Sequence, residues 1–345
     1  MVKVLVVDDS PTVQELMKYI LNFDKDIEVI GIANNGIEAL KFLETMRPDV
    51  ITMDINMPYM NGFEATKRIM QTNPVPIIIM TALFSSTDVE RTFEAIQAGA
   101  VSVIDKPVSI KNPNYNNICK NIIDKIKLIS EIKVVKRNFR RKIDLKQMIE
   151  IEPQFNNDCT NKKVVAIGIS TGGPPILKKI FSMLNENIQI PILIVQHITP
   201  GFINGLVDWL RQDTKIPIHI ASNGQRILPG NIYFAPDDYQ MEVIFNNIIS
   251  LNKKDKINGL RPTVSSLFNS IANTYGKNSI GILLSGMGRD GVEEMKILKE
   301  RGAVTVAQEK ESCVVYGMPG EAVKINAATY ILSLEKIAEL INKAQ

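Results

Sequence analysis

Carboxylates, a hydroxyl and an ammonium stand at the ends of successive apolar runs in the first third of the chain, a combination suited to phosphoryl chemistry. They are Asp8 and Asp9 after Val2–Val7, Asp54 after Val50–Met53, Thr81 at the end of Ile77–Thr81, and Lys106 after Val101–Asp105. Gathered carboxylates repel one another unless a cation bridges them, and Mg²⁺ prefers such oxygen ligands. A carboxylate beside Mg²⁺ can attack a phosphoryl group, because the metal neutralises charge on both oxygens. Thr81 and Lys106 could then hold the phosphoryl oxygens.

These acids have a second interpretation as helix caps, and the segment Asp8-Asp9-Ser10-Pro11 would suit that role. A cap explains a single acid after a strand. It does not explain why residues of the right types follow several successive runs, so the pattern favours a phosphoacceptor pocket over a set of caps.

A serine flanked by glycines marks a second candidate site, in the second half of the chain. Residues 168–174 read GISTGGP, follow the apolar run Val164–Ile169 and precede an apolar helical pattern. Glycines permit the tight strand-to-helix turn that exposes a nucleophilic hydroxyl such as that of Ser170. Free N–H groups at the helix start can stabilise an oxyanion, and the same groups can bind phosphate. The motif alone leaves a nucleophile, a phosphate loop and a plain turn open.

The chain has two histidines, and their positions favour His197 as a general base. His197 follows the apolar run Ile190–Val195, at the same kind of strand end as Ser170. His219 lies inside the alternating run Ile216–Ala221, where we expect a structural role. A neutral imidazole bonded to the serine can take its proton near pH 7.

An acid should orient the imidazole of such a base, and Asp290 is the best candidate. It stands in the glycine-containing loop 284–291, which reads LSGMGRDG. The alternative is that Asp290 caps a helix beginning near Val292. The chain order Ser170, His197, Asp290 differs from the serine, acid, histidine order of α/β-hydrolases, so the G-x-S-x-G match is misleading about the fold family.

The elements that must position these residues form an α/β pattern, because apolar strand-like runs alternate with amphipathic helical segments. The expected strands of the first half are Val2–Val7, Ile27–Ala33, Val50–Met53, Ile77–Thr81 and Val101–Asp105. Those of the second half are Val164–Ile169, Ile190–Val195, Ile216–Ala221, Ile232–Ala235, Met241–Phe245, Ile280–Leu284 and Ala303–Ala307. The sequence predicts two doubly wound parallel-sheet domains. The carboxyl ends of parallel strands line one crevice, so each candidate set should converge.

The length of 345 residues suggests two domains. We expect a first domain over residues 1–129, a basic linker over 130–160 and a second domain over 161–345. The linker carries clustered Lys and Arg between residues 133 and 142 but no strand pattern. A solvated linker explains this cluster better than a nucleic-acid-binding segment does.

Composition points to an ordinary globular protein of the cytoplasm. The net charge of +3 is too weak to indicate nucleic-acid or membrane binding. No stretch approaches the roughly 18 consecutive apolar residues of a membrane span, and the first residues lack the features of a signal peptide. The three cysteines, Cys119, Cys159 and Cys313, have no metal-type spacing and fit reduced thiols.

Residues 1 to about 129 resemble a response-regulator receiver domain, which has a flavodoxin-like fold. The matching segments are VVDDS (6–10), MDINMP (53–58), MTA (80–82) and DKP (105–107). The resemblance implies Asp54 as the phosphorylated residue. It implies Asp9 and Asp54 as Mg²⁺ ligands, with Asp8 acting through water and the Asn56 carbonyl contributing.

Residues from about 161 to 345 resemble the catalytic domain of chemotaxis protein-glutamate methylesterases, which implies a Rossmann-like hydrolase domain without a cofactor. The matching segments are GISTGGP (168–174), QH (196–197), PGF (200–202), YFAP (233–236), RPT (261–263), LSGMGRDG (284–291) and VVYGMP (314–319). The resemblance implies a triad of Ser170, His197 and Asp290. It also implies Thr171 as a hydrogen-bonding neighbour of the histidine and the Met287 backbone N–H as an oxyanion donor.

Four positions depart from the patterns of these families. Val103 stands where receivers often have an aromatic switch residue, and Asn56 where methylesterase receivers often have Glu. Residues 238–240 read DYQ where a histidine is usual, and Gly320 replaces a frequent basic residue. The departures concern switching and substrate fit, and none falls on the triad.

The two resemblances together imply a phosphorylation-regulated serine hydrolase of chemosensory adaptation. It would remove methyl groups from glutamate γ-methyl esters of methyl-accepting chemoreceptors, releasing methanol, and would deamidate receptor glutamines more slowly. A histidine kinase of the pathway would donate the phosphoryl group. A receptor-docking module without catalysis and an enzyme acting mainly on amides remain alternatives. A DNA-binding regulator would need a helix-turn-helix or winged-helix output domain, which the second half does not resemble.

Overall fold

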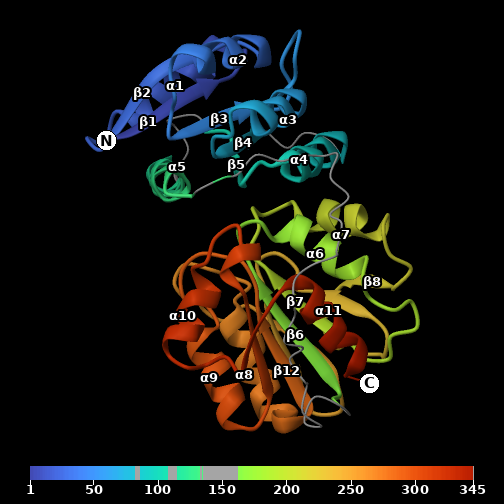
Figure 1. The fold of residues 1–345 in the computed structure, drawn as a ribbon. Helices are drawn as coiled ribbons and strands as arrows, with labels where there is room; N and C mark the ends of the chain where they lie inside the picture. The colour runs from blue at the N-terminus through green and yellow to red at the C-terminus, as the bar shows by residue number, and fades with distance from the viewer. Residues whose placement is uncertain (82–85, 108–114, 133, 135–161, 345) are drawn as a thin grey trace. The chain divides into compact units, whose positions relative to one another are not determined.

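The computed structural model describes residues 1–81, 86–107, 115–132, 134 and 162–344, and it divides the chain into two compact units (Figure 1). The units are Met1–Ile149 and Glu150–Gln345, so the division falls inside the linker expected at 130–160. The basic run of that linker lies outside the described residues. The exact linker boundaries therefore stay a prediction.

The first unit is a five-stranded sheet with the strand order β2-β1-β3-β4-β5, and every strand pair is parallel. The strands are β1 (Val2–Val7), β2 (Ile27–Ala33), β3 (Val50–Asp54), β4 (Ile77–Thr81) and β5 (Ser102–Asp105). The helices are α1 (Pro11–Leu21), α2 (Gly36–Thr45), α3 (Gly62–Thr72), α4 (Ser86–Ala98) and α5 (Tyr115–Ser130). This order is that of flavodoxin-like doubly wound folds, which confirms the expected fold class.

The local sequence explains how the helices of this unit begin. The side chains of Asn35 and Asn61 accept hydrogen bonds from the first N–H groups of α2 and α3, which would otherwise lack partners. At the start of α3, a side chain on Gly62 would overlap the Asp54 carbonyl. Glycine at this position lets α3 begin directly against the end of β3.

The second unit is a seven-stranded parallel sheet with the order β14-β13-β12-β6-β7-β9-β8. Its strands are β6 (Val164–Ile169), β7 (Ile192–Gln196), β8 (Ile218–Ile220), β9 (Ile232–Phe234), β12 (Ser279–Leu283), β13 (Val304–Gln308) and β14 (Tyr330–Leu332). Its α-helices are α6 (Gly173–Phe181), α7 (Ile203–Arg211), α8 (Val264–Thr274), α9 (Val292–Glu300), α10 (Met318–Lys324) and α11 (Leu334–Lys343). Helices α6, α7 and α11 cover one face, and α8, α9 and α10 cover the other (Figure 1).

Two expectations about this unit need correction. The run Met241–Phe245 does not join the parallel sheet, because β10 (Gln240–Ile244) pairs antiparallel with β11 (Ile248–Asn252) in a separate hairpin. Asn246 and Asn247 both have positive φ and make the tight turn that the hairpin needs. The strand β14 at the sheet edge was not expected, since Tyr330–Leu332 is too short to show an apolar pattern.

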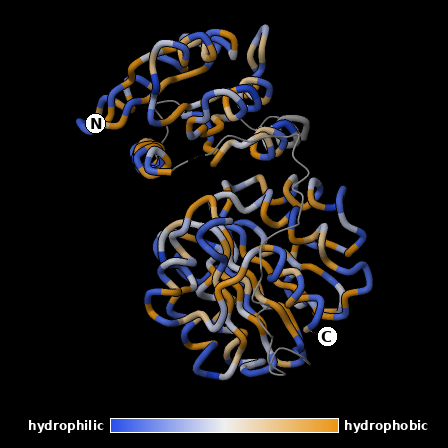
Figure 2. The backbone as a smooth tube through the Cα atoms, viewed as in Figure 1, coloured by the Kyte–Doolittle hydropathy of each residue, from blue (hydrophilic) through white to orange (hydrophobic). Residues whose placement is uncertain are grey.

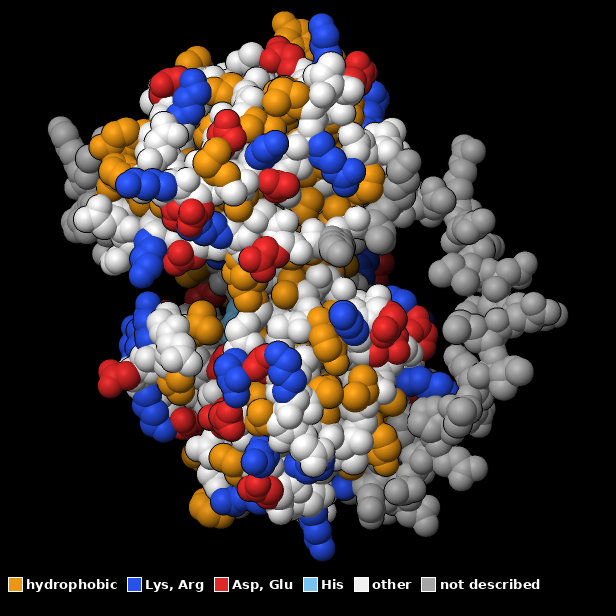
Figure 3. All heavy atoms as spheres, turned by 60° about the vertical axis from the view of Figure 1, so that its left-hand side comes forward, with side chains coloured by type: hydrophobic (Ala, Val, Ile, Leu, Met, Phe, Trp, Pro, Cys, Tyr) orange, Lys and Arg blue, Asp and Glu red, His pale blue; other side chains and the backbone are white. Residues whose placement is uncertain are grey.

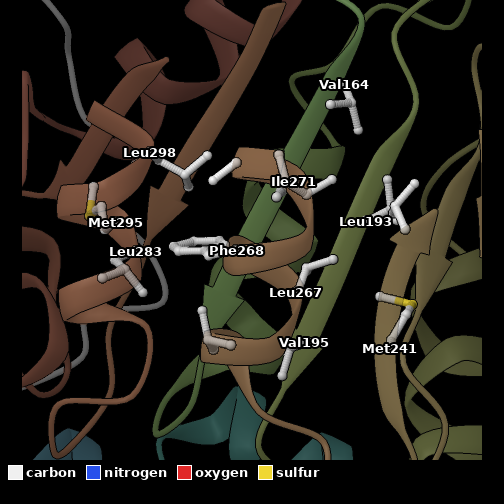
Figure 4. Packing of buried hydrophobic residues seen from close by; sticks show 14 of the residues in the cluster. Val164, Leu193, Val195, Met241, Leu267, Phe268, Ile271, Leu283, Met295 and Leu298 are labelled. Carbon is white, nitrogen blue, oxygen red and sulfur yellow. The ribbon is translucent and has the colours of Figure 1, made fainter. Parts of the chain in front are cut away.

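The core of the second unit lies between the sheet and helix α8. Hydrophobic stretches follow the central strands in Figure 2. Leu267, Phe268 and Ile271 of α8 are fully buried and belong to one cluster with Val164 of β6 and Leu193 of β7 (Figure 4). Burial of a side chain such as Phe268 contributes about 1.5–3 kcal/mol relative to its exposure. This packing fixes the position of the first turn of α8.

The surface carries both signs of charge. Lys and Arg side chains are interspersed with Asp and Glu on the face of each unit drawn in Figure 3. Mixed charge of this kind agrees with the small net charge of the sequence. Among the described residues, no helix is long and apolar enough to span a membrane.

Candidate active site

Three acids of the first unit converge at the carboxyl ends of β1 and β3, as the sequence predicted. Carboxylate oxygens of Asp8, Asp9 and Asp54 all lie within 4.8 Å of one another. Asp8 and Asp54 are buried, whereas Asp9 is exposed. The parallel register of β1 and β3 brings these strand ends together. The group could hold a divalent cation through oxygen ligands.

The Lys106 ammonium lies between two of these carboxylates. Its Nζ is 2.8 Å from Oδ2 of Asp8 and 2.9 Å from Oδ2 of Asp54. Burial lowers the pKa of Lys106, but the bonds to Asp8 and Asp54 outweigh it and raise the pKa above its usual value. Burial raises the pKa of Asp54, and Asp8 adds to this, although Lys106 opposes the rise. The pocket therefore holds a buried carboxylate against a fixed cation.

The remaining predicted residues of this pocket, Thr81 and Asn56, stand at the end of β4 and just beyond the end of β3. Thr81 is buried at the end of β4, and its carbonyl accepts a 2.9 Å hydrogen bond from the Lys106 N–H. The side chain of Asn56 accepts a 2.9 Å hydrogen bond from the guanidinium of Arg91 on α4. Both residues thus lie at the same edge of the sheet as the acids, while their roles stay predictions.

The serine turn of the second unit lies where the strand order of the sheet reverses. Strands β7, β8 and β9 follow β6 in the chain and lie on one side of it in the sheet. The later strands β12, β13 and β14 lie on the other side. Such a switch point leaves a crevice at the carboxyl ends of the strands. Ser170 follows β6, and its N–H donates a 3.0 Å hydrogen bond to the carbonyl of Ser285 beyond β12. An added Cβ at Gly286 would come 2.7 Å from the Ser170 Cβ, so glycine permits this approach.

His197 lies on the neighbouring strand end and faces Asp290. The backbone N–H of His197 donates a 2.9 Å hydrogen bond to the carbonyl of Ile169, the residue before Ser170. Its Nε2 lies 2.8 Å from Oδ2 of Asp290, although the ring nitrogen is not aligned with that oxygen as in an ideal hydrogen bond. Within the described part of the chain, neither the Ser170 hydroxyl nor the Thr171 hydroxyl is hydrogen-bonded to His197. The Nδ1 atom of the ring is the nitrogen left for the serine.

The Asp290 carboxylate is held by the first turn of α8. Its Oδ2 accepts from the Val264 N–H at 2.7 Å, and its Oδ1 accepts from the Ser265 N–H at 3.1 Å and the Ser265 hydroxyl at 2.8 Å. Burial by itself raises the pKa of Asp290, but the contact with His197 and the bonds from Ser265 and Val264 bring it below the usual value. Asp290 is therefore an ionised, fully partnered carboxylate beside the imidazole.

Two backbone N–H groups near Ser170 are candidates for an oxyanion site. The loop after β12 is fixed because the Gly286 carbonyl accepts from the Met318 N–H at 2.8 Å. Its next residue, Met287, donates its N–H to no partner among the described residues, and the same holds for the Thr171 N–H after the serine. The Thr171 carbonyl accepts a 2.8 Å bond from the Ser285 hydroxyl, which ties the two loops together.

Gln196 was not among the predicted site residues, yet it joins the serine turn to the histidine loop. Its buried side-chain amide donates to the carbonyls of Ser170 and His197 at 2.9 and 2.8 Å. A side chain on Gly173 would overlap the Gln196 amide oxygen. The position of Gln196, directly before the candidate base at a buried strand end, was the available signal.

His219 occupies a different environment from His197. Its Nε2 lies 2.7 Å from the Asn231 amide oxygen, and its ring stacks on Tyr233 with centroids 5.4 Å apart. These partners agree with the expected structural role.

The fold and the sites together define a two-unit α/β protein. The first unit has a flavodoxin-like sheet with an acid pocket, and the second has a parallel sheet with a serine, a histidine and an aspartate near its strand ends. Comparison with known proteins agrees with this class. Residues 165–341 match the family model described as CheB methylesterase, and residues 4–113 match the response regulator receiver domain.

Full-length relatives share both parts. The protein-glutamate methylesterase/protein-glutamine glutaminase 1 of Syntrophus aciditrophicus is 49% identical over 344 residues, covering 99% of this chain and 98% of that protein. The corresponding protein of Nitrosospira multiformis is 47% identical over 338 residues, covering 98% and 95%. The crystal structure of the Thermotoga maritima CheB methylesterase catalytic domain is 38% identical, with a TM-score of 0.51, and covers 52% of this chain and 97% of that one. The chain belongs to the CheB methylesterase family.

Proposed function

We propose that this protein hydrolyses glutamate γ-methyl esters of methyl-accepting chemoreceptors, releasing methanol, under the control of phosphorylation at Asp54. The observation that supports it most is the 2.8 Å contact of His197 with Asp290 on the strand end next to Ser170. Relatives along the whole chain carry the name protein-glutamate methylesterase. The protein would act in the cytoplasm, as expected from its scattered thiols.

In the acylation step, the Ser170 hydroxyl oxygen attacks the ester carbonyl carbon while Nδ1 of His197 accepts its proton. Asp290, already ionised, stabilises the imidazolium that forms. The carbonyl oxygen becomes an oxyanion, for which the free N–H groups of Met287 and Thr171 supply donors. Collapse breaks the bond to the methoxy oxygen, which takes the proton back from His197 and leaves as methanol.

In the deacylation step, water attacks the acyl-serine and gives its proton to His197. The ester bond to Ser170 breaks, the serine oxygen recovers a proton from the imidazolium, and the glutamic acid side chain that forms on the receptor releases its remaining proton to solvent. Both steps use the same residues in the same protonation cycle.

Phosphorylation would use the acid pocket of the first unit. The proximity of Asp8, Asp9 and Asp54, with Asp54 buried, fits a divalent cation held by oxygen atoms. Asp9, Asp54 and the Asn56 carbonyl would bind Mg²⁺ directly and Asp8 through water. Bound Mg²⁺ would neutralise charge between the Asp54 carboxylate and the incoming phosphoryl group. Lys106 and the Thr81 hydroxyl would hold the phosphoryl oxygens, and a histidine kinase would be the donor.

The test is methanol release from methylated receptor fragments by the full chain. Wild type and Ser170→Ala are compared, each with and without acetyl phosphate and Mg²⁺. We expect serine-dependent release that rises with the phosphodonor. Equal release from both proteins, or none from folded wild type on verified methylated receptor, would contradict the proposal.

A glutaminase activity is the second candidate, because the relatives are also named protein-glutamine glutaminase. The same acyl-serine could form from a side-chain amide with ammonia as the leaving group. Ammonia leaves less readily than methanol, so we expect deamidation to be slower. Ammonia release from unmethylated receptor fragments carrying glutamine measures it directly.

A further inference from the structure

One hydroxyl joins the catalytic aspartate to a second carboxylate. The Ser265 Oγ lies 2.8 Å from Oδ1 of Asp290 and 2.8 Å from Oε2 of Glu294. It also accepts a 3.1 Å hydrogen bond from the Gly291 N–H. A serine hydroxyl has a single hydrogen. When both carboxylates are ionised, that hydrogen can serve only one of them at a time.

We propose that Ser265 is a positioning residue for Asp290 and that Glu294 competes for its hydrogen. The proposal rests on the proposed function, since it concerns the same triad. When Glu294 is protonated, its hydroxyl can donate to Ser265 and the serine hydrogen stays on Asp290. When Glu294 is ionised, the two carboxylates share the serine hydrogen, and Asp290 receives this hydrogen bond for only part of the time.

Glu294 is partly exposed and borders a pocket on the surface of the second unit. Ser265 and Glu294 line a pocket of about 570 Å³ beside the hairpin β10–β11. The other charged groups lining it are Glu242, Lys253, Lys254 and Asp255. Lys254 is paired with Glu242 at 2.8 Å and Lys253 lies 3.7 Å from Asp238. Both lysines therefore have acidic partners other than Glu294.

The competition has a direction that kinetics can measure. A hydrogen bond from Ser265 spreads the negative charge of Asp290, so less of that charge stabilises the imidazolium form of His197. Loss of the hydroxyl strengthens the stabilisation and should move the acidic limb of the kcat/KM profile to higher pH. Removal of the competing Glu294 carboxylate should move the same limb to lower pH.

The experiment compares pH profiles of methanol release for the full-length wild type, Ser265→Ala, Glu294→Gln and the double variant. For Ser265→Ala we expect kcat to fall on the order of 10-fold with little change in KM, because Asp290 loses a donor that holds its position. The acidic limb should rise by about 0.5 pH units, because the charge of Asp290 is less spread. Ser265→Thr keeps the hydroxyl and should restore the wild-type limb. Glu294→Gln should lower the limb in the wild-type background only.

The double variant separates action through Ser265 from a direct effect of the Glu294 charge. If Glu294→Gln shifts the limb equally with and without the Ser265 hydroxyl, the competition does not exist. An unchanged profile in Ser265→Ala, with wild type active and Ser170-dependent, would overturn the inference alone. Loss of Ser170 dependence would instead overturn the proposed function.

Discussion

The two units each bury an aspartate at or beyond the end of a parallel strand, and the surroundings shift the pKa values of the two carboxyl groups in opposite directions. Asp54 and Asp290 are 4% and 7% exposed. Burial raises the pKa of Asp54 and is not overcome by Lys106, whereas the donors around Asp290 overcome burial and lower its pKa. Equal burial therefore does not decide the charge of a carboxylate. The number and kind of its hydrogen-bond donors do.

The partners of the two acids account for the difference. Asp54 has a backbone donor in the Ile55 N–H, at 2.7 Å, and its other oxygen lies 2.9 Å from the Lys106 ammonium, which Asp54 shares with Asp8. Asp290 has both oxygens held by rigid donors from α8 and by His197. The proposed role of Asp54 as phosphoacceptor requires one of its oxygens to be available to the phosphoryl group. The proposed role of Asp290, to orient His197, is served by donors that hold both of its oxygens.

The largest expected effect comes from neutralising Asp290. Asp290→Asn should lower kcat for methanol release by about 10³- to 10⁴-fold, because the imidazolium of His197 loses its stabilising charge and the ring its orientation. The measurement is the initial rate at saturating methylated receptor. Asp208→Asn, at an exposed position on α7, is the matched control. Activity within a few-fold of wild type would mean that the two aspartates do not differ as described.

Neutralising Asp54 should have a different signature. Asp54→Asn should abolish incorporation of label from radioactive acetyl phosphate and remove the rise in methanol release that the phosphodonor causes. Basal release should stay within about 2-fold, since Asp54 takes no part in the triad chemistry. Asp26→Asn is the control, because Asp26 is an exposed acid of the same unit. Label retained on Asp54→Asn would place the phosphorylated residue elsewhere.

Removal of divalent metal should affect phosphorylation at the acid pocket but not hydrolysis at the serine site, without any substitution. With EDTA we expect label incorporation to fall by at least about 10-fold, because the acid pocket loses the cation that neutralises the attacking carboxylate. Release of methanol without phosphodonor should be unaffected. A matched loss of basal hydrolysis would show that the serine site also depends on metal.

The smallest expected effect is on stability, and it has opposite signs at the two acids. Asp290 has a lowered pKa in the folded state, so its ionisation stabilises the fold above its unfolded pKa, and this contribution is lost as pH falls through the folded pKa. Asp290→Asn should therefore reduce the free energy of unfolding by about 1–3 kcal/mol at pH 7, with a smaller difference under acid conditions. The measurement is denaturant unfolding followed by tryptophan fluorescence. Trp209 is the only tryptophan and lies on α7, so its fluorescence reports unfolding of the second unit.

Asp54, whose pKa is raised, should behave in the reverse way. Its ionisation costs stability above the unfolded pKa, and acidification relieves this cost. Calorimetry of full-length Asp54→Asn should show unfolding of the first unit at the wild-type temperature or above it. A clear fall for Asp54→Asn, comparable to that for Asp290→Asn, would remove the contrast between the two sites.

Much of the site could be predicted because all strands of a parallel sheet end at the same edge of the sheet. Residues that follow apolar runs must lie at one edge of the sheet, so Asp8, Asp54 and Lys106 were expected together. The adjacency of Ser170 and His197 follows in the same way from neighbouring parallel strands. The Asn246-Asn247 turn signalled the hairpin that was missed, since such residues adopt positive φ readily.

The sequence by itself determined the two α/β units and the strand ends at which the candidate residues stand, and it predicted a triad of Ser170, His197 and Asp290. Only the tertiary structure decided which donors hold that carboxylate. The first turn of α8 reaches Asp290 because Leu267 and Phe268 pack against the sheet, far from Asp290 in the chain. The spacing of residue types along the chain predicts helices, strands and the positions at which strands end. The charge state of a buried group depends on donors that packing brings from other elements.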